Sequence, residues 1–511
     1  MARSDDNTVV AVATEQTPLL ATDDVVPAAD PVASGLTTLQ NSRPATSAGD
    51  SSSNNQNDED DDRPLPGWQV TVLCYARLIE PMAFFSIFPY INQMAQENGN
   101  LADTDVGFYS GLIESLFSLT QASVMILWGK AADRVGRKPV LVFSLIGVSV
   151  ATSIFGLAKT LVQMILFRCL AGVFAGTIVT IRTMLSEIST TKTQAVAFSW
   201  FAFSGNLGIF LGPLVGGGLA DPAHQYPKLF GNVQFFLDYP YALSSLVISV
   251  IGFTGAVIAA LFVKETLERG ESPAEDGVVK PKDDSPSIME IVKAPGVFMV
   301  LCVFCWIGFL GVTYTAIFPV FLFTPVALGG LGLAPYQISI FITLTGAAQA
   351  LWLLIIFPPL QHRFGTNAVI RGCAVVYPFF FAVMPLSNIL LRNGAVTAFW
   401  VITPVINVLF SSVSMSFTGI QLALNDIAPS PKVLGTLNSL ALMSVSLMRS
   451  FTPALASSLF ALFARTQWLW GYAIWLLMVI FAAWFTVISR WLPPEKGKKA
   501  MIDRDSREEE G

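Results

Sequence analysis

Hydrophobic residues recur along this chain in long runs that short polar stretches separate. Six runs cover about 68–92, 106–128, 139–158, 161–180, 194–220 and 239–263, and six more cover about 296–324, 335–359, 368–387, 395–420, 433–463 and 471–491. A helix of about 20 residues crosses a hydrocarbon core of about 30 Å. The pattern predicts an all-α, polytopic membrane protein with 12 transmembrane helices in two six-helix halves.

Polar segments flank and separate the two groups of runs. The first 63 residues are rich in Ser, Thr, Asn, Asp and Ala, so they cannot bury enough apolar surface to fold alone. They contain no apolar signal region, and we expect the first helix itself to direct membrane insertion. The expected segments are a disordered tail of 1–63, a first half of 64–263, a linker of 264–294, a second half of 295–492 and a C-terminal tail of 493–511.

The distribution of Lys and Arg between alternate loops predicts the orientation. One set of loops holds most of the cations: Lys130, Arg134, Arg137, Lys138, Arg182, Lys192, the five cations of the linker, Arg363, Arg371 and Lys432. The other set holds only Lys159, Lys228, Arg392 and Arg465. Because positively charged loops resist translocation, we expect the first set, and both termini, to be cytosolic.

Composition excludes several other classes of protein. Hydrophobic residues make up 53% of the chain and charged residues 13%, against about 25% charged in soluble domains. The net charge of −6 comes largely from the tails, and no basic stripe favours nucleic acid. Only two histidines occur, both in loops, so histidine ligation of a transported metal is disfavoured. No nucleotide-binding loop is present, so we expect no cofactor and an ion gradient as the energy source.

The most specific motif lies between the second and third predicted helices. It reads Trp128-Gly129-Lys130-Ala131-Ala132-Asp133-Arg134-Val135-Gly136-Arg137-Lys138. Gly129 and Gly136 permit a tight turn, while Asp133 can cap the following helix or pair with a cation. The cations of the motif hold the loop on the cytosolic side. A merely basic turn would account for these cations but not for an aspartate between glycines.

A second motif lies in the fifth predicted helix. It reads Gly208-x-x-x-Gly212-Pro213-x-x-Gly216-Gly217 and follows Ser199. Small residues four apart let helix backbones approach closely, and Pro213 removes a backbone donor and bends the helix. A general helix-packing face is the alternative interpretation of the glycines.

Two charged residues stand alone within apolar runs. Arg168 lies in the fourth predicted helix and is followed by Gly172 and Gly176. An arginine inside a membrane costs at least about 2.5 kcal/mol, so we expect it to face an aqueous cavity or a partner acid. Glu114 has no charged neighbour within a helical turn, and a desolvated carboxyl group can load and release a proton. An inert acid that lines a cavity is the alternative for Glu114.

Three further charges lie within predicted helices. Arg77 and Glu80 stand three residues apart in the first helix, where they can pair on one face. A structural ion pair and a role in proton coupling both remain open for them. Arg449 precedes Pro453 in the eleventh helix, where packing and contact with an anionic substrate are both open.

Together these motifs resemble those of the major facilitator superfamily, in its 12-span drug:proton antiporter branch. The loop motif, the Ser199-anchored motif and the helix-1 run of 78–84 are similar to the zinc-induced-facilitator-like group of fungi and plants. The resemblance implies proton-coupled antiport that exports a small organic molecule, metabolite, drug or metal chelate by alternating access. It also implies that Gly129, Asp133, Gly136 and Arg137 form a latch between the halves, and that Arg168 acts in proton coupling.

Two alternative functions and a sorting signal also follow from the sequence. A sugar-type importer usually carries Pro-Glu-Ser-Pro-Arg after the sixth helix, whereas this chain shares only a Glu-Thr pair there. A non-transporting receptor or scaffold on the same fold would need neither the loop motif nor Arg168. Glu15, Leu19 and Leu20 match an acidic dileucine sorting signal, which a sorting adaptor would bind. We expect a monomer in the vacuolar or plasma membrane, with the lipid bilayer, a small molecule and protons as its partners.

Overall fold

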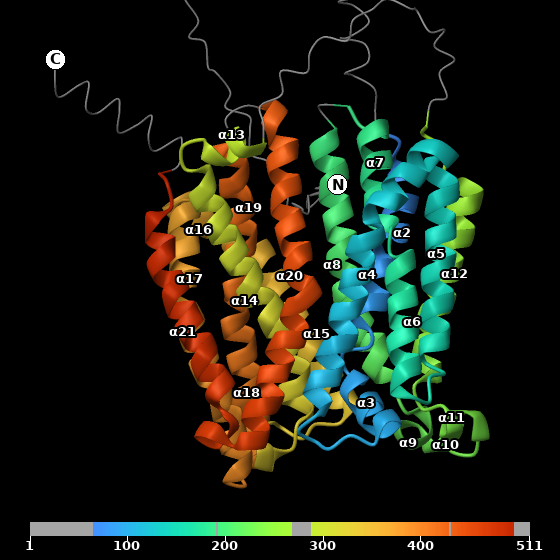
Figure 1. Cartoon of the computed structure of the whole chain (residues 1–511), viewed down its shortest axis with the longest axis vertical. Helices are drawn as coiled ribbons and strands as arrows, with labels where there is room; N and C mark the ends of the chain where they lie inside the picture. Colours follow the sequence, from blue (N-terminus) through green and yellow to red (C-terminus); the bar gives the residue numbers. More distant parts are fainter. Residues whose placement is uncertain (1–64, 191–192, 268–287, 429–430, 495–511) are drawn as a thin grey trace, which may run out of the picture.

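The computed structural model describes residues 65–190, 193–267, 288–428 and 431–494 (Figure 1). Within these ranges the regular structure is helical and contains no strand. Most of the predicted tails and linker lie outside the described residues, as do Glu15, Leu19 and Leu20 of the proposed sorting signal. The described residues include all twelve predicted apolar segments.

The first half is built from eight longer helices and a group of short ones. The longer helices are α2 (Gly67–Phe85), α3 (Ile91–Gly99), α4 (Val106–Val135), α5 (Arg137–Phe155), α6 (Leu161–Phe174), α7 (Thr177–Ile188), α8 (Gln194–Gly218) and α12 (Ala242–Phe262). The short helices are α9 (Pro222–Gln225), α10 (Pro227–Phe230) and α11 (Gln234–Asp238).

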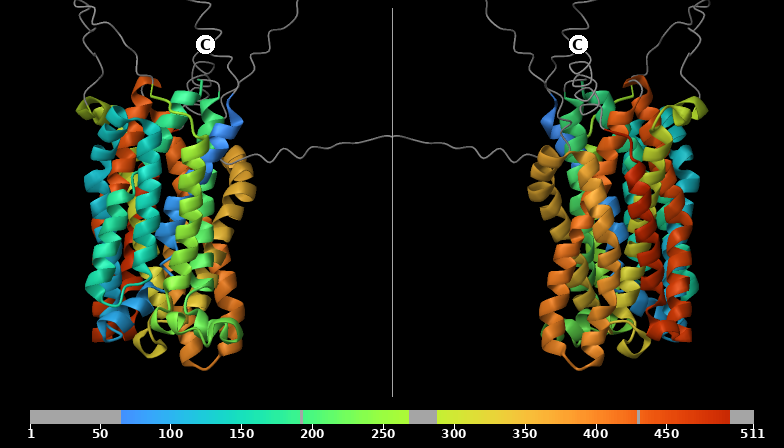
Figure 2. Two further views of the ribbon diagram at one scale, coloured as in Figure 1. Left: turned by 90° about the vertical axis from the view of Figure 1, so that its right-hand side faces the viewer. Right: turned by 90° about the vertical axis from the view of Figure 1, so that its left-hand side faces the viewer.

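The second half has the same kind of architecture. Its helices are α13 (Ile288–Lys293), α14 (Val297–Phe323), α15 (Pro335–Leu351), α16 (Phe357–Phe364), α17 (Thr366–Arg392), α18 (Val396–Phe410), α19 (Met415–Ile427), α20 (Pro431–Thr466) and α21 (Ala473–Ile488). A π-helical turn, Trp352–Ile356, joins α15 to α16, and a 3-10 turn, Ser411–Ser414, joins α18 to α19. Figure 2 shows the long helices of both halves running roughly parallel.

The described helices agree with the predicted spans in all but one case. Within the described residues, eleven helical segments are long and apolar enough to cross a membrane, and three of these segments join α6 to α7, α15 to α16 and α18 to α19. The remaining predicted segment, 68–92, corresponds to α2 and the start of α3, which the turn after Phe85 separates. α2 is not among these eleven segments, and it contains Arg77, Glu80 and Pro81. The prediction of an all-α polytopic membrane fold is confirmed.

The two halves meet at one end of the molecule. We call the end at which α2 begins and α12 ends the tail end, and the opposite end the closed end (Figure 1). At the closed end α4 packs on α20, where Ser115 Oγ accepts a hydrogen bond of 2.9 Å from the Ala454 N–H. There too α8 packs on α15, where Ser339 Oγ donates a hydrogen bond of 2.6 Å to the Pro213 carbonyl.

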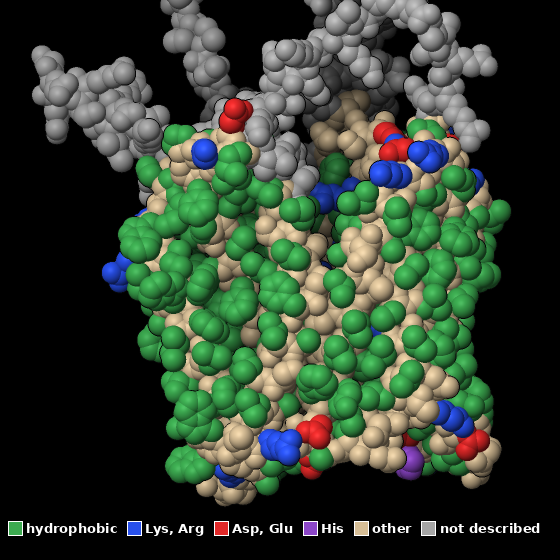
Figure 3. Space-filling model, viewed as in Figure 1, with side chains coloured by type: hydrophobic (Ala, Val, Ile, Leu, Met, Phe, Trp, Pro, Cys, Tyr) green, Lys and Arg blue, Asp and Glu red, His purple; other side chains and the backbone are tan. Residues whose placement is uncertain are grey.

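Glycines allow the close approach of α4 and α20. A Cβ at Gly111 would lie 2.5 Å from the Pro453 carbonyl oxygen, and one at Gly107 would lie 3.1 Å from that of Ser457. Any side chain at Gly111 would therefore push the two halves apart. At the tail end, by contrast, the surface between the halves is hollowed, and Lys or Arg side chains lie inside the hollow (Figure 3).

Candidate transport site

Glu114 and Arg168 form a buried pair of opposite charges inside the first half. Glu114 lies on α4 and Arg168 on α6, and each is 4% exposed. The two charges attract each other, yet among the described residues they form no salt bridge within 4 Å. Glu114 is thus a carboxyl group in a buried setting without a hydrogen-bonded counter-ion.

The guanidinium group of Arg168 is held by α2 and by two aromatic rings. Its Nη2 donates a hydrogen bond of 3.1 Å to the Phe84 carbonyl. The guanidinium carbon lies 4.9 Å from the ring centre of Phe84 and 4.4 Å from that of Phe117. Its Nε is buried and has no partner among the described residues. The cation is therefore fixed in position while part of its hydrogen-bonding capacity is unused.

The predicted fourth helix is broken between α6 and α7, and α4 satisfies the backbone at the break. The Trp128 indole N–H donates a hydrogen bond of 2.7 Å to the Val173 carbonyl. Gln121 Nε2 donates one of 3.0 Å to the Ala175 carbonyl. A Cβ at Gly176 would lie 2.6 Å from the ring of Trp128. The glycine that follows Arg168 by eight residues therefore serves the packing of this segment on α4.

Glu80 of α2 lies beside the first residue of α7, close to this break. Its carboxylate accepts a hydrogen bond of 2.6 Å from Gln121 Nε2 and another from the Thr177 hydroxyl. Thr177 is the first residue of α7, and a helix N-terminus favours a nearby negative charge. Among the described residues Glu80 and Arg77 form no salt bridge within 4 Å, so the structure does not contain the ion pair that their spacing allows.

The loop motif belongs to a network of charged residues at the tail end of the first half. Arg137 forms a salt bridge with Asp133, and its Nε donates a hydrogen bond of 3.2 Å to Glu187 on α7. The Glu265 carboxylate accepts hydrogen bonds from the backbone N–H groups of Arg137, at 2.8 Å, and Lys138, at 3.1 Å. Burial raises the pKa of Glu265, but its hydrogen bonds with backbone N–H groups lower the pKa further, to below its ordinary value. This carboxylate therefore stays charged at neutral pH and caps α5.

Two details of the loop motif differ from the prediction. Gly136 makes the turn, with φ of +122°, but Gly129 lies inside α4, where a Cβ would meet nothing within 4 Å. The expectation that Gly129 shapes the turn is wrong, because α4 continues to Val135. The partners of Asp133 and Arg137 belong to the first half, while Arg134 is exposed. The structure brings Glu187 and Glu265 into the network, which the sequence analysis missed because both lie far along the chain.

Most of the α8 glycines pack on α2. A Cβ on each of three of them would meet a backbone carbonyl of α2 or of Ser86, the residue that follows it, at the pairs Gly208–Leu78, Gly212–Met82 and Gly216–Ser86. Gly217 instead faces the Ser339 side chain of α15, across the interface between the halves. Pro213 accepts the hydrogen bond from the same serine. The motif therefore combines tight packing inside one half with a contact between the halves.

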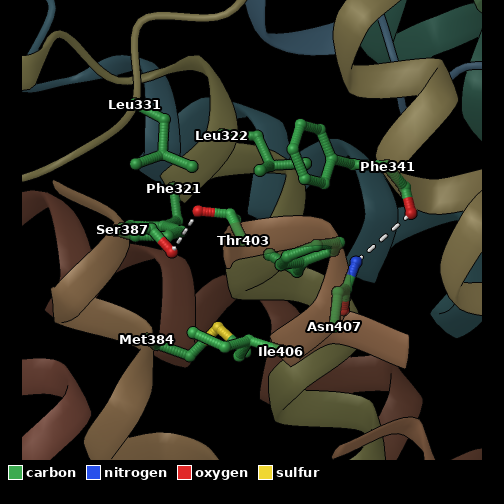
Figure 4. Close-up of a pocket in the computed structure, with 10 residues that line it drawn as sticks. Phe321, Leu322, Leu331, Phe341, Met384, Ser387, Thr403, Ile406 and Asn407 are labelled. Carbon is green, nitrogen blue, oxygen red and sulfur yellow. Dashed lines mark hydrogen bonds between the residues drawn. The ribbon is translucent and has the colours of Figure 1, made fainter. Parts of the chain in front are cut away.

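A small cavity lies apart from these charges, inside the second half (Figure 4). Its empty volume is about 250 Å³, and the residues around it include Phe321, Phe341, Met384, Ser387, Thr403 and Asn407. Thr403 donates a hydrogen bond of 3.1 Å to the Ser387 hydroxyl, and Asn407 Nδ2 donates one of 2.8 Å to the Thr345 hydroxyl. The polar groups thus bond mainly to one another and to the backbone, and they leave little room for a ligand. We assign this cavity to packing.

Two helical halves that meet at one end, with buried charges inside the first half and a hollow between the halves at the other end, define a multi-pass membrane transporter. The family model described as Major Facilitator Superfamily matches residues 73–453. The chain belongs to this superfamily, and it is a transporter, not an enzyme.

Comparison with known proteins agrees with this assignment. The chain is 43% identical over 432 residues to "Efflux pump azaK" of Aspergillus niger, a match that covers 84% of this chain and 89% of that protein. It is 27% identical over 422 residues to "Protein ZINC INDUCED FACILITATOR-LIKE 1" of Arabidopsis thaliana, with coverages of 79% and 86%. The predicted resemblance to this group is confirmed.

A solved structure shares the fold. It is a bacterial homolog of the human lysosomal transporter Spinster, in an inward-facing and occupied conformation. The TM-score is 0.61 at 15% sequence identity, and the match covers 84% of this chain and 98% of the other. At this identity the likeness concerns the fold alone.

Proposed function

We propose that the chain is a proton-coupled antiporter that exports a small organic molecule, metabolite, drug or metal chelate by alternating access. Its similarity to a protein named as an efflux pump supports the direction of transport. The observation that carries the coupling is the buried carboxyl group of Glu114, which faces Arg168 without a salt bridge.

Proton coupling follows from the cost of an unpaired buried charge. A carboxylate in a low-dielectric setting is stabilised when it takes up a proton or when a cation approaches. Arg168 is held by Phe84 and Phe117, so it attracts Glu114 from a distance without neutralising it. In the proposed cycle, protonation of Glu114 and binding of the solute exclude each other, and Arg168 tunes the exchange.

The arrangement of the halves supplies the alternating access. The hollow lies at the tail end, and the cation-rich loops make this the cytosolic end in our proposal. The solute would enter from the cytosol and leave after the contacts at the closed end open. We retain a proton-coupled importer as the second candidate, since the same fold serves either direction of transport.

Replacement of Glu114 by Gln tests the coupling. In proteoliposomes, a pH gradient should drive accumulation of a transported solute by the wild type and not by Glu114→Gln, because Gln cannot carry the proton. Exchange of labelled for unlabelled solute without a pH gradient should persist in the variant, which shows that it is folded and binds. If Glu114→Gln accumulates solute as fast as the wild type does, Glu114 has no part in coupling.

A further inference from the structure

Three arginines other than Arg168, two from the first half and one from the second, have charges that interact with Glu80 or with one another. Arg77 comes from α2, Arg182 from α7 and Arg449 from α20. The charges of Arg182 and Arg449 are close enough to that of Arg77 to repel it, and Glu80 attracts both Arg77 and Arg449. Both halves of the protein therefore contribute to one cluster of charges.

Arg449 points toward the first half and into open space. Residues two apart on a helix point about 200° away from each other. Leu447 and Phe451, on either side of Arg449, are 63% and 45% exposed and form part of the apolar outer face of α20. Arg449 therefore faces the interior, where Glu80 of the first half attracts it. Its side chain is nevertheless exposed, so it borders an open space.

Aromatic rings hold the two arginines of the first half. The guanidinium carbon of Arg77 lies 4.9 Å from the ring centre of Phe201. That of Arg182 lies 5.9 Å from the same ring and 5.8 Å from that of Phe198. A ring attracts a nearby cation through its π face, and this contact leaves the N–H donors of the guanidinium group free for a ligand.

Among the described residues, these cations have no acid paired with them. Within the described parts of the chain, none of the three arginines forms a salt bridge within 4 Å, and Arg77 Nε is buried with no hydrogen-bond partner. The nearby acid, Glu80, already accepts hydrogen bonds from Gln121 and Thr177. Arginines within a membrane are costly, and they mark substrate pathways when they remain unpaired.

We propose that the space between the halves binds an organic anion through Arg77, Arg182 and Arg449, so that the exported solute is anionic. This inference rests on the proposed export function and adds the class of its substrate. The guanidinium fork matches the geometry of a carboxylate, sulfonate or phosphate group. Phe198 and Phe201 add ring surface beside the cations, which suits an anion that carries a planar ring system.

Two dyes of similar shape and opposite charge test the proposal. Fluorescein is an anion and rhodamine 123 a cation, and both contain the xanthene ring system. Binding to the full-length protein in detergent is followed by fluorescence polarisation at one pH of about 8, where fluorescein is fully ionised. Wild type should bind fluorescein more tightly than rhodamine 123. Arg449→Gln and Arg77→Gln should each weaken fluorescein binding about 10-fold or more, as expected for loss of a charge-assisted hydrogen bond.

Matched variants separate a lost contact from a lost fold. Arg465→Gln alters an exposed arginine on the same helix and should bind fluorescein as the wild type does. Arg449→Lys should recover part of the affinity. Tighter binding of rhodamine 123, no saturable binding of fluorescein, or unchanged affinity in both Gln variants would overturn the proposal. Since no pH gradient is involved, this result is independent of whether Glu114→Gln loses proton-driven accumulation.

Discussion

At the scale of single residues, Gly136 determines how the loop between α4 and α5 closes. Its φ of +122° lies in the region that residues with side chains rarely adopt, and a Cβ there would lie 2.6 Å from Glu265 Oε2. The absent side chain leaves room for the Glu265 carboxylate to reach the first N–H groups of α5. The loop between α4 and α5 can therefore contact the segment that follows α12 only because residue 136 is a glycine.

Alanine at the two motif glycines should have opposite consequences. Gly136→Ala combines a strained backbone with a clash, so we expect it to lower stability by about 1–3 kcal/mol. Gly129→Ala lies in a helix with open space around it, so we expect no loss and up to about 1 kcal/mol of gain. Thermal unfolding of both variants in the same detergent measures the difference. Equal melting temperatures for the two would contradict the assignment of the turn to Gly136.

The sequence identified the loop motif but could not identify its partners. The sequence indicated that Asp133 can pair with a cation, and the structure shows that this cation is Arg137. Glu187 and Glu265 stand 50 and 128 residues from Arg137, so only tertiary packing brings them together. For the same reason, pairing of Arg77 with Glu80 was plausible from their spacing, yet neighbouring helices supply the partners of Glu80.

At the scale of helices, α8 is shaped to lie against α2. Its glycines recur every four residues and meet successive turns of α2, where backbone atoms leave no space for a side chain. The sequence predicted close packing from this spacing. It could not predict that α2 is the main partner, nor that Gly217 alone faces the second half. The break between α6 and α7 and the π-helical turn after α15 also depend on neighbouring helices and were not predicted.

Alanine at Gly212 tests this packing. A Cβ there would lie 2.7 Å from the Met82 carbonyl oxygen, and backbone cannot move aside cheaply. We expect Gly212→Ala to destabilise the protein by about 1–3 kcal/mol, as overpacking does. Gly218→Ala, at the end of the same helix, meets nothing within 4 Å and serves as the control. If heating in detergent unfolds both variants at the wild-type temperature, α8 does not pack on α2 as described.

At the scale of the whole molecule, small residues hold the halves together at the closed end and leave the tail end hollow. Gly107 and Gly111 allow α4 to touch α20, and the Ser115–Ala454 and Ser339–Pro213 hydrogen bonds join the halves. The contacts combine small side chains, backbone atoms and these two hydrogen bonds. Transport in our account requires them to break and reform, while each half moves largely as a unit.

One measurement tests the coupling and this motion together. A Cβ at Gly107 would lie 3.6 Å from the Ala461 Cβ, a separation that suits a disulfide. The double variant Gly107→Cys and Ala461→Cys is made in a protein that lacks the native cysteines and still transports. It is reconstituted into vesicles that contain a pH-sensitive dye, and solute is added outside. Reduced protein should let solute in and drive protons out, so the interior becomes alkaline, and oxidation should abolish this signal. Acidification or no change with reduced protein, or an unaltered signal after cross-linking, would contradict the account.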